Sequence, residues 1–278
     1  MSALPKFLEE LAYPWKREIQ ERPKPVWVDV EQPVMGGKCF TVFTKGMWVL
    51  EEGPGMFQSW LCTAAGSGGV VIRDGIPDKN GIFEGLEEGM REFMRTGKAD
   101  FNGKPLYIAH PAVMQPWALN GGFHRGLTLE LTNTNPRVPG GGAVTVGTIV
   151  WHKHGARKPT AEKKKPALPD WKPIPGVKEY FTPPAPGSLM RAAFVTEPGV
   201  HRLSRRPCEL YSVELMIPGA WPRVYLREST GKIAWYEPSA FTGSFVHGGG
   251  MKDLVLELHS NSSCQATINW REPDMEIV

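Results

Sequence analysis

The residues that first suggest chemistry are the run His247, Gly248, Gly249 and Gly250. In some lipases and esterases an HGGG loop supplies backbone amides to an oxyanion hole. Those enzymes also need a GxSxG nucleophile elbow, which this sequence lacks. Because a lone short motif is a weak signal, we interpret the glycines as a turn before a strand and expect no catalytic residue.

Two other patterns could hold a metal or serve as acid and base. His152 and His154 alternate, so a strand would place both on one face. No third ligand lies nearby in the sequence, and a solvated pair is therefore the better interpretation. Adjacent carboxylates diverge on a helix or strand, so we expect ordinary surface charges at the acidic pairs Glu9-Glu10, Glu51-Glu52 and Glu87-Glu88. With no HExxH, Walker A or GxGxxG motif in the sequence, we predict neither a metal nor a cofactor.

Tryptophan is abundant, with 10 residues in the chain. Exposed Trp side chains on a β-sandwich can stack on sugar rings, whereas buried ones fill cores and interfaces. Trp117 and Trp221 stand beside prolines in predicted loops, so they are candidates for contact with a partner. A carbohydrate-binding or receptor-binding accessory module that uses these loop residues is therefore one hypothesis.

The four cysteines, Cys39, Cys62, Cys208 and Cys264, show no CxxC spacing. A chain of 278 residues can build a core without disulfides. We predict free, mostly buried thiols in a protein assembled in a reducing cytoplasm.

Composition indicates which elements must position these residues. Hydrophobic residues make up 41% and charged residues 22% of the chain, as in folded globular proteins. The 31 Gly and 26 Pro disfavour a helical bundle and favour many turns between short strands. The start of the sequence shows no secretory signal, and the longest apolar stretch, 143–151, is far shorter than a membrane span.

Three sequence blocks occur twice in the same order, which indicates a duplicated unit. They pair GGFHRGLTLEL with GGGMKDLVLEL, VVIRD with VYLRE, and TIVW with TINW, at residues 121–131 and 248–258, 70–74 and 224–228, and 148–151 and 267–270. We therefore expect the two halves to share one fold despite different loops.

The repeated blocks alternate in polarity as strands do. Each half should contribute a core-facing row of leucines and a closing tryptophan: Leu127, Leu129, Leu131 and Trp151 in the first, and Leu254, Leu256, Leu258 and Trp270 in the second. Turn signals follow the VIRD and YLRE strands at Asn80-Gly81 and Thr230-Gly231. The sequence predicts an all-β protein of two tandem antiparallel β-sandwich domains, jelly-roll or immunoglobulin-like.

A short helix is predicted as an insertion in the first sandwich, near 85–97. Leu86, Met90, Phe93 and Met94 recur there at helical spacing, so the helix should lie over the sandwich, although Gly89 weakens it. An added edge strand is possible in Trp27–Val30.

A second short helix is expected near the start of the chain, where Phe7, Leu8 and Leu11 line one face shortly before Trp15. An isolated helix of this length is marginal in water and needs a surface to cover. These four residues are therefore candidates for binding a neighbouring subunit.

The net charge of +3 is concentrated in one segment. Between His152 and Lys172, basic residues outnumber acidic ones and prolines are frequent, which predicts a solvated linker stiffened by polyproline geometry. Lys163, Lys164, Lys165 and Trp171 are candidates for contact with an acidic partner. Nucleic acid is disfavoured because no further aromatic platform accompanies the lysines.

These patterns define four regions. They are an N-terminal arm at 1–25, a first sandwich at 26–152, a basic Pro-rich linker at 153–176 and a second sandwich at 177–278. The arm and the segment 152–175 have little apolar pattern to offset the entropy of ordering, about 1–2 kcal/mol per residue. We expect both to become ordered by contact with neighbouring subunits.

The order of the motifs resembles small β-sandwich domains that are common in virion proteins of tailed bacteriophages. The matching residues are Val70–Gly75, Gly121–Leu131 and Val144–Trp151, with a diverged copy at Val224–Glu228, Gly248–Leu258 and Ala266–Trp270. The second copy has Ser229 where the first has Gly75, so its turn must differ. Such domains serve as capsid decoration, neck or tail-associated proteins and have no catalytic residues to carry over.

The resemblance implies a structural component of a phage virion, assembled in the host cytoplasm, rather than an enzyme. Its expected partners are other virion proteins, such as capsid or tail subunits, and copies of itself. The resemblance implies no membrane partner, and a glycan is the ligand under the alternative hypothesis.

Overall fold

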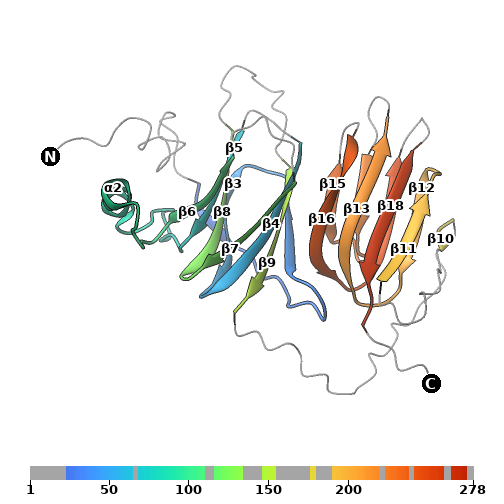
Figure 1. Cartoon of the computed structure of the whole chain (residues 1–278), viewed down its shortest axis with the longest axis horizontal. Helices are drawn as coiled ribbons and strands as arrows, with labels where there is room; N and C mark the ends of the chain where they lie inside the picture. Colours follow the sequence, from blue (N-terminus) through green and yellow to red (C-terminus); the bar gives the residue numbers. More distant parts are fainter. Residues whose placement is uncertain are drawn as a thin grey trace.

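The computed structural model describes residues 23–64, 68–109, 116–133, 146–154, 176–179, 190–218, 223–237, 241–259 and 264–273. Figure 1 shows two β-sandwiches side by side, one from each half of the chain, as the repeat predicts. The first holds β1 (Pro25–Trp27), β2 (Lys38–Val42), β3 (Gly46–Glu52), β4 (Gly55–Ala64), β5 (Gly68–Asp74), α2 (Leu86–Thr96), β6 (Lys104–Ala109), β7 (Pro116–Phe123), β8 (Gly126–Asn133) and β9 (Val146–Lys153). The second holds β10 (Lys178–Glu179), β11 (Met190–Val195), β12 (Gly199–Ser204), β13 (Cys208–Ile217), β14 (Arg223–Arg227), β15 (Ile233–Glu237), β16 (Phe241–Met251), β17 (Leu254–His259) and β18 (Gln265–Arg271).

The described strands of the two halves follow one topology. The first half has sheets in the orders β1-β3-β8-β5-β6 and β2-β9-β4-β7, and the second has β10-β12-β17-β14-β15 and β11-β18-β13-β16. The orders become identical when β1 to β9 are matched in sequence with β10 to β18. Even the short first strands agree, because β1 runs parallel to β3 and β10 parallel to β12. The fold class is therefore all-β, with two tandem sandwiches.

Register defines which residues are equivalent. The β-bulge of β4 beside Trp151 recurs in β13 beside Trp270. A second bulge, in β3 opposite the start of β8, recurs in β12 opposite the start of β17. Leu129 and Leu256 thus occupy the same central position in their sheets, and Trp151 and Trp270 the same place in β9 and β18.

The leucine rows and closing tryptophans lie in two apolar cores. All eight side chains named for the core are buried: Leu127, Leu129, Leu131, Trp151, Leu254, Leu256, Leu258 and Trp270. They pack with the inward residues of the facing sheet in each sandwich. Alternation along the strand places every second residue on that side, which is why one repeated motif builds both cores.

Each closing tryptophan has a carboxylate as hydrogen-bond partner, but the carboxylate comes from a different position in each half. Trp151 donates its indole N–H to Glu51 in β3, and Lys38 of β2 pairs with that carboxylate at 2.7 Å. In the second half Ser204 occupies the position of Glu51, and Glu272 takes over as acceptor for Trp270. Each buried indole therefore keeps a carboxylate partner, which satisfies its donor.

The inserted helix covers a small satellite core. Leu86 and Met90 of α2 are buried with Met47, Phe83 and Phe101, whereas Phe93 and Met94 are exposed, contrary to the four-residue apolar face expected. Gly89 allows Phe101 to pack closely on the helix, because an added Cβ there would lie 2.1 Å from Cγ of Phe101. In the described part of the chain, no helix has the length and apolar character that a membrane crossing needs.

In the part of the chain that the structure describes, the second sandwich meets the first mainly through two strands. β15 and β16 each end a sheet, and both pack against β2, β4 and β9 of the first half. Figure 1 shows β15 and β16 at the centre of the molecule, next to the sheet that holds β4 and β9. The outward side chains Cys39, Leu61 and Val150 of that sheet are buried in the core cluster of the second half. The junction therefore includes an apolar contact between the two halves.

Candidate functional site

The glycine run at 248–250 is a strand segment at the junction, which corrects its interpretation as a turn. All three glycines lie in β16, and Gly249 forms an isolated bridge with Gly37 of the first half. The Gly37 amide donates to the carbonyl of Gly248 at 2.8 Å, and the Gly250 amide donates to the carbonyl of Gly37 at 2.7 Å. Because glycine has no side chain, the run allows the backbone of β16 to approach the backbone around Gly37 closely.

Replacing Gly250 with alanine should damage this contact. An added Cβ would lie 1.8 Å from the carbonyl oxygen of Met35 and 2.4 Å from Cβ of Pro33. We expect a loss of about 1–3 kcal/mol in the free energy of unfolding, because the backbone must move. Gly122, at the equivalent position in β7, has no neighbour within 4 Å of such a Cβ. Urea denaturation of Gly250→Ala and Gly122→Ala tests this, and equal losses would contradict it.

His247 is a structural residue of the same strand. It is fully buried, its Nε2 lies 3.0 Å from the carbonyl of Ala234, and its Nδ1 accepts from the Gly249 amide. Burial lowers the pKa of His247 to about 4. A neutral ring with both nitrogens engaged is not poised to act as a catalytic base near neutral pH.

This histidine should make stability depend on pH. Its folded pKa of about 4 lies below the ordinary value of 6.5, so the unfolded chain binds more protons between these limits. The part of the free energy of unfolding that depends on a neutral His247 is fully present above pH 6.5 and is lost as the pH falls to 4. This part amounts to about 3 kcal/mol. Denaturation at several pH values should show a shallower pH dependence in His247→Gln than in the wild type, with His154→Gln as the exposed control. Identical pH profiles would contradict this role.

His152 and His154 do not form the solvated pair predicted. His152 is partly buried against the junction, with Nε2 2.7 Å from Oε1 of Gln58, and burial lowers its pKa. His154 is exposed and donates its backbone amide to the carbonyl of Pro54. No group of three or more metal-ligating side chains occurs among the residues that the structure describes.

Glu51 is also not the surface charge expected. It is 7% exposed, and Lys38, Lys153 and Trp151 all donate to its carboxylate. Burial alone would raise the pKa of Glu51, but hydrogen bonds from Lys153, Lys38 and Trp151 outweigh burial and hold it below its usual range. The carboxylate therefore stays charged and structural.

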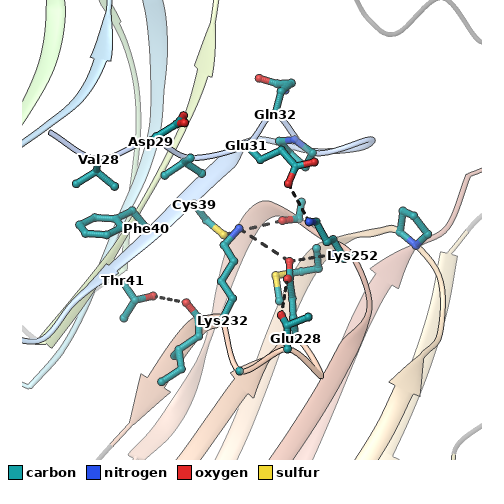
Figure 2. Close-up of a pocket in the computed structure, with 18 of the residues that line it drawn as sticks. Val28, Asp29, Glu31, Gln32, Cys39, Phe40, Thr41, Glu228, Lys232 and Lys252 are labelled. Carbon is teal, nitrogen blue, oxygen red and sulfur yellow. Dashed lines mark hydrogen bonds and ion pairs between the residues drawn. The ribbon is translucent and has the colours of Figure 1, made fainter. Parts of the chain in front are cut away.

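A cavity of about 610 Å³ lies at the junction. Its walls come from residues 28–34 and 39–43 of the first half and from the turns around 228–233 and 250–252 of the second. Figure 2 shows Glu31, Lys252, Glu228 and Lys232 around it, with Thr41 donating to the second half. Lys252 pairs with Glu31 at 2.8 Å, and Lys232 lies 3.9 Å from Glu228. The charged groups thus compensate one another.

The cavity's thiol is not activated. Cys39, Cys208 and Cys264 are free and buried, as predicted, while the side chain of Cys62 lies outside the described residues. Burial raises the pKa of the Cys39 thiol. A nucleophilic cysteine needs the opposite shift, so Cys39 is not activated as a nucleophile.

The sheet β11-β18-β13-β16 presents an outward side that we call the open face. It carries Ala192, Phe194, Ser212, Glu214, Met216, Val246, Thr267 and Asn269. Phe194, Met216 and Val246 are 59%, 44% and 47% exposed. Aromatic residues and methionine are enriched at protein–protein interfaces, and Phe194 and Met216 place both kinds of side chain on this face.

Most residues predicted to bind partners lie outside the described part of the chain. These are Phe7, Leu8, Leu11, Trp15, Lys163, Lys164, Lys165, Trp171 and Trp221, together with the arm and most of the linker. Trp117 lies in strand β7, paired with Trp60, and not in a loop. The predicted edge strand exists as β1, slightly earlier in the chain than expected, with Trp27 55% exposed.

The tryptophans with described side chains favour the core over a sugar platform. Trp48, Trp60, Trp151, Trp235 and Trp270 are buried, and Trp27 is exposed. Sequence reasoning missed the open face, for which the alternation of exposed residues in β13 was the available signal.

No protein-family model matches the chain, and no curated protein matches it significantly. Among solved structures, the coconut allergen cocosin is 12% identical, with 91% of this chain and 86% of that chain covered at a TM-score of 0.20. Procruciferin from Brassica napus is 11% identical, with 92% and 86% covered at 0.22. A mutant oxalate decarboxylase from Bacillus subtilis is 10% identical, with 99% and 85% covered at 0.21. Such low scores carry no conclusion about activity.

Proposed function

We propose that the chain is a structural subunit of a tailed-bacteriophage particle, a capsid decoration, neck or tail-associated protein. It works by binding other virion subunits and copies of itself, without catalysis. The observation that carries the proposal is the open face, whose exposed Phe194, Met216 and Val246 mark a surface suited to another protein. That the other protein belongs to a phage particle is inferred from the resemblance of the sequence motifs.

Charged groups that recur in both halves support a non-enzymatic role. The carboxylate of Asp74 accepts backbone amides of His124 and Arg125 in the turn after β7, and Glu228 accepts the Lys252 amide in the equivalent turn. Arg73 pairs with Glu130, and Arg227 with Glu257, at matching positions. Charged side chains that make equivalent contacts in both halves are better explained as stabilising the shared fold than as parts of a single active site.

Particle composition tests the proposal. Particles produced from the genome that encodes the chain would be purified on gradients, analysed by mass spectrometry and labelled with antibodies against the purified chain. We expect the chain in the particles, with label confined to one structural region. Abundant chain in infected lysate and none in purified particles would overturn the proposal.

The glycan-binding alternative makes a separate prediction. A glycan array with the purified chain would reveal sugar binding that depends on exposed aromatic residues such as Trp27. Sugar binding that Trp27→Ala abolishes, together with absence from particles, would favour the alternative.

A further inference from the structure

We propose that the open face binds the β6–β7 edge of a second copy of the chain, repeating between molecules the contact that joins the two sandwiches within one. The inference deepens the proposed function, on which it rests for its biological setting. Its physical basis is the internal duplication.

The contact inside the chain joins an edge to a face. The edge is β15 and β16, and the face is the outward side of the β2-β9-β4-β7 sheet. Thr41 donates its hydroxyl to the carbonyl of Ile233 at 2.8 Å, and Ser59 donates to the carbonyl of His247 at 3.3 Å. The first half thus offers hydroxyls and apolar side chains, and the second half offers strand carbonyls.

The open face of the second half corresponds to the outward side of the β2-β9-β4-β7 sheet in the first half, which we call the covered face. Register matches Cys39, Leu61 and Val150 with Ala192, Glu214 and Asn269. Ser59 and Thr148 match the identical residues Ser212 and Thr267. The face of the first half is buried by the second sandwich, whereas the same face of the second half exposes Phe194 and Met216.

Differences between the two faces fit a contact that forms only on assembly. The permanently covered face has Leu61 and Val150, where the open face has Glu214 and Asn269. A surface that must stay wetted in the free chain carries more polar residues than one buried during folding. Phe194, 59% exposed, remains as the apolar anchor.

The matching edge is present at the other end of the molecule. β6 and β7 each end a sheet of the first half, as β15 and β16 do in the second. Ile108 occupies the position of Tyr236, whose ring lies 6.0 Å from that of Phe43 across the junction. Ile108 is 38% exposed and is therefore available for the same role. Face and edge lie on different sandwiches, so association is head-to-tail and produces a ring or a filament.

Paired variants test the geometry on the full chain. Phe194→Asp should disrupt binding by the open face and leave the β6–β7 edge intact. Ile108→Asp should disrupt binding by the edge and leave the open face intact. Met94→Asp, on α2 and also exposed, is the matched control. Analytical ultracentrifugation should show oligomers for the wild type and Met94→Asp, and at least tenfold weaker association for each of the other two. Circular dichroism establishes that each variant is folded.

Mixing the two assembly variants distinguishes head-to-tail from symmetric contact. Phe194→Asp and Ile108→Asp together retain one working face and one working edge, so the mixture should form two-chain complexes and nothing larger. A wild type that stays at 30.8 kDa at its highest soluble concentration would overturn the inference. So would unaltered assembly of a folded Phe194→Asp. Particle labelling is scored independently, so absence from particles contradicts the virion role while leaving this contact intact.

Discussion

Replacing Trp151 or Trp270 with alanine should lower the free energy of unfolding by about 3–5 kcal/mol in each case. Both side chains are almost completely buried, and each donates its indole N–H to a carboxylate, Glu51 or Glu272. Truncation leaves a large cavity and removes a hydrogen-bond donor from the acidic partner, and both costs add to the lost apolar burial.

Urea denaturation of the full chain, followed by circular dichroism, measures these losses. Trp27→Ala is the control because this tryptophan is 55% exposed, and it should change stability by no more than about 0.5 kcal/mol. Trp151→Phe and Trp270→Phe separate the lost hydrogen bond from the lost volume and should cost less than the alanine variants. Alanine losses below about 1 kcal/mol would show that these rings are not core residues.

The strand cores could be predicted from sequence because burial has a short local period. Leu127, Leu129 and Leu131 alternate with polar residues, so the pattern alone identifies the inward side. The turns at Asn80-Gly81 and Thr230-Gly231 were predictable for a similar reason, since Gly81 and Gly231 adopt the positive φ that such turns require.

The burial of Glu51 could not be predicted in this way. Its partners Lys38 and Lys153 lie 13 and 102 residues away and come to it only through the pairing of β2, β3 and β9. An adjacent acidic pair gives no sign of such long-range compensation. Whether a charged side chain is buried and paired depends on how the strands assemble. The sequence pattern of one strand does not show which residues of other strands will lie beside it.

The glycine run shows how sequence alignment and register can differ. Gly248 aligns with Gly121 by sequence, but strand pairing matches Gly121 with Gly249, because the chain from Phe123 to Leu127 is one residue longer than the matching chain from Met251 to Leu254. That shift is invisible without the partner strands. The open face could be predicted only in part: the alternation in β13 indicates an outward side, but whether that side is covered depends on where the second sandwich sits against the first.

The buried ion pair of Arg73 and Glu130 should be as important as the core tryptophans. Nε of Arg73 lies 3.1 Å from Oε1 of Glu130, both side chains are at most 1% exposed, and Arg73 also donates to the carbonyl of Gly103. Arg73→Met should cost about 3–5 kcal/mol, because it leaves a buried carboxylate without its counter-charge. The double variant Arg73→Met with Glu130→Leu should recover most of that loss, since two apolar residues can replace a buried pair.

The second half supplies the matched control for this pair. Arg227 and Glu257 occupy the equivalent positions at 2.8 Å but are 24% and 21% exposed, so solvent screens their attraction. Arg227→Met should therefore cost only about 1 kcal/mol or less. Similar losses for Arg73→Met and Arg227→Met, with no recovery in the double variant, would mean that the geometry of the arginine matters more than compensation of a buried charge.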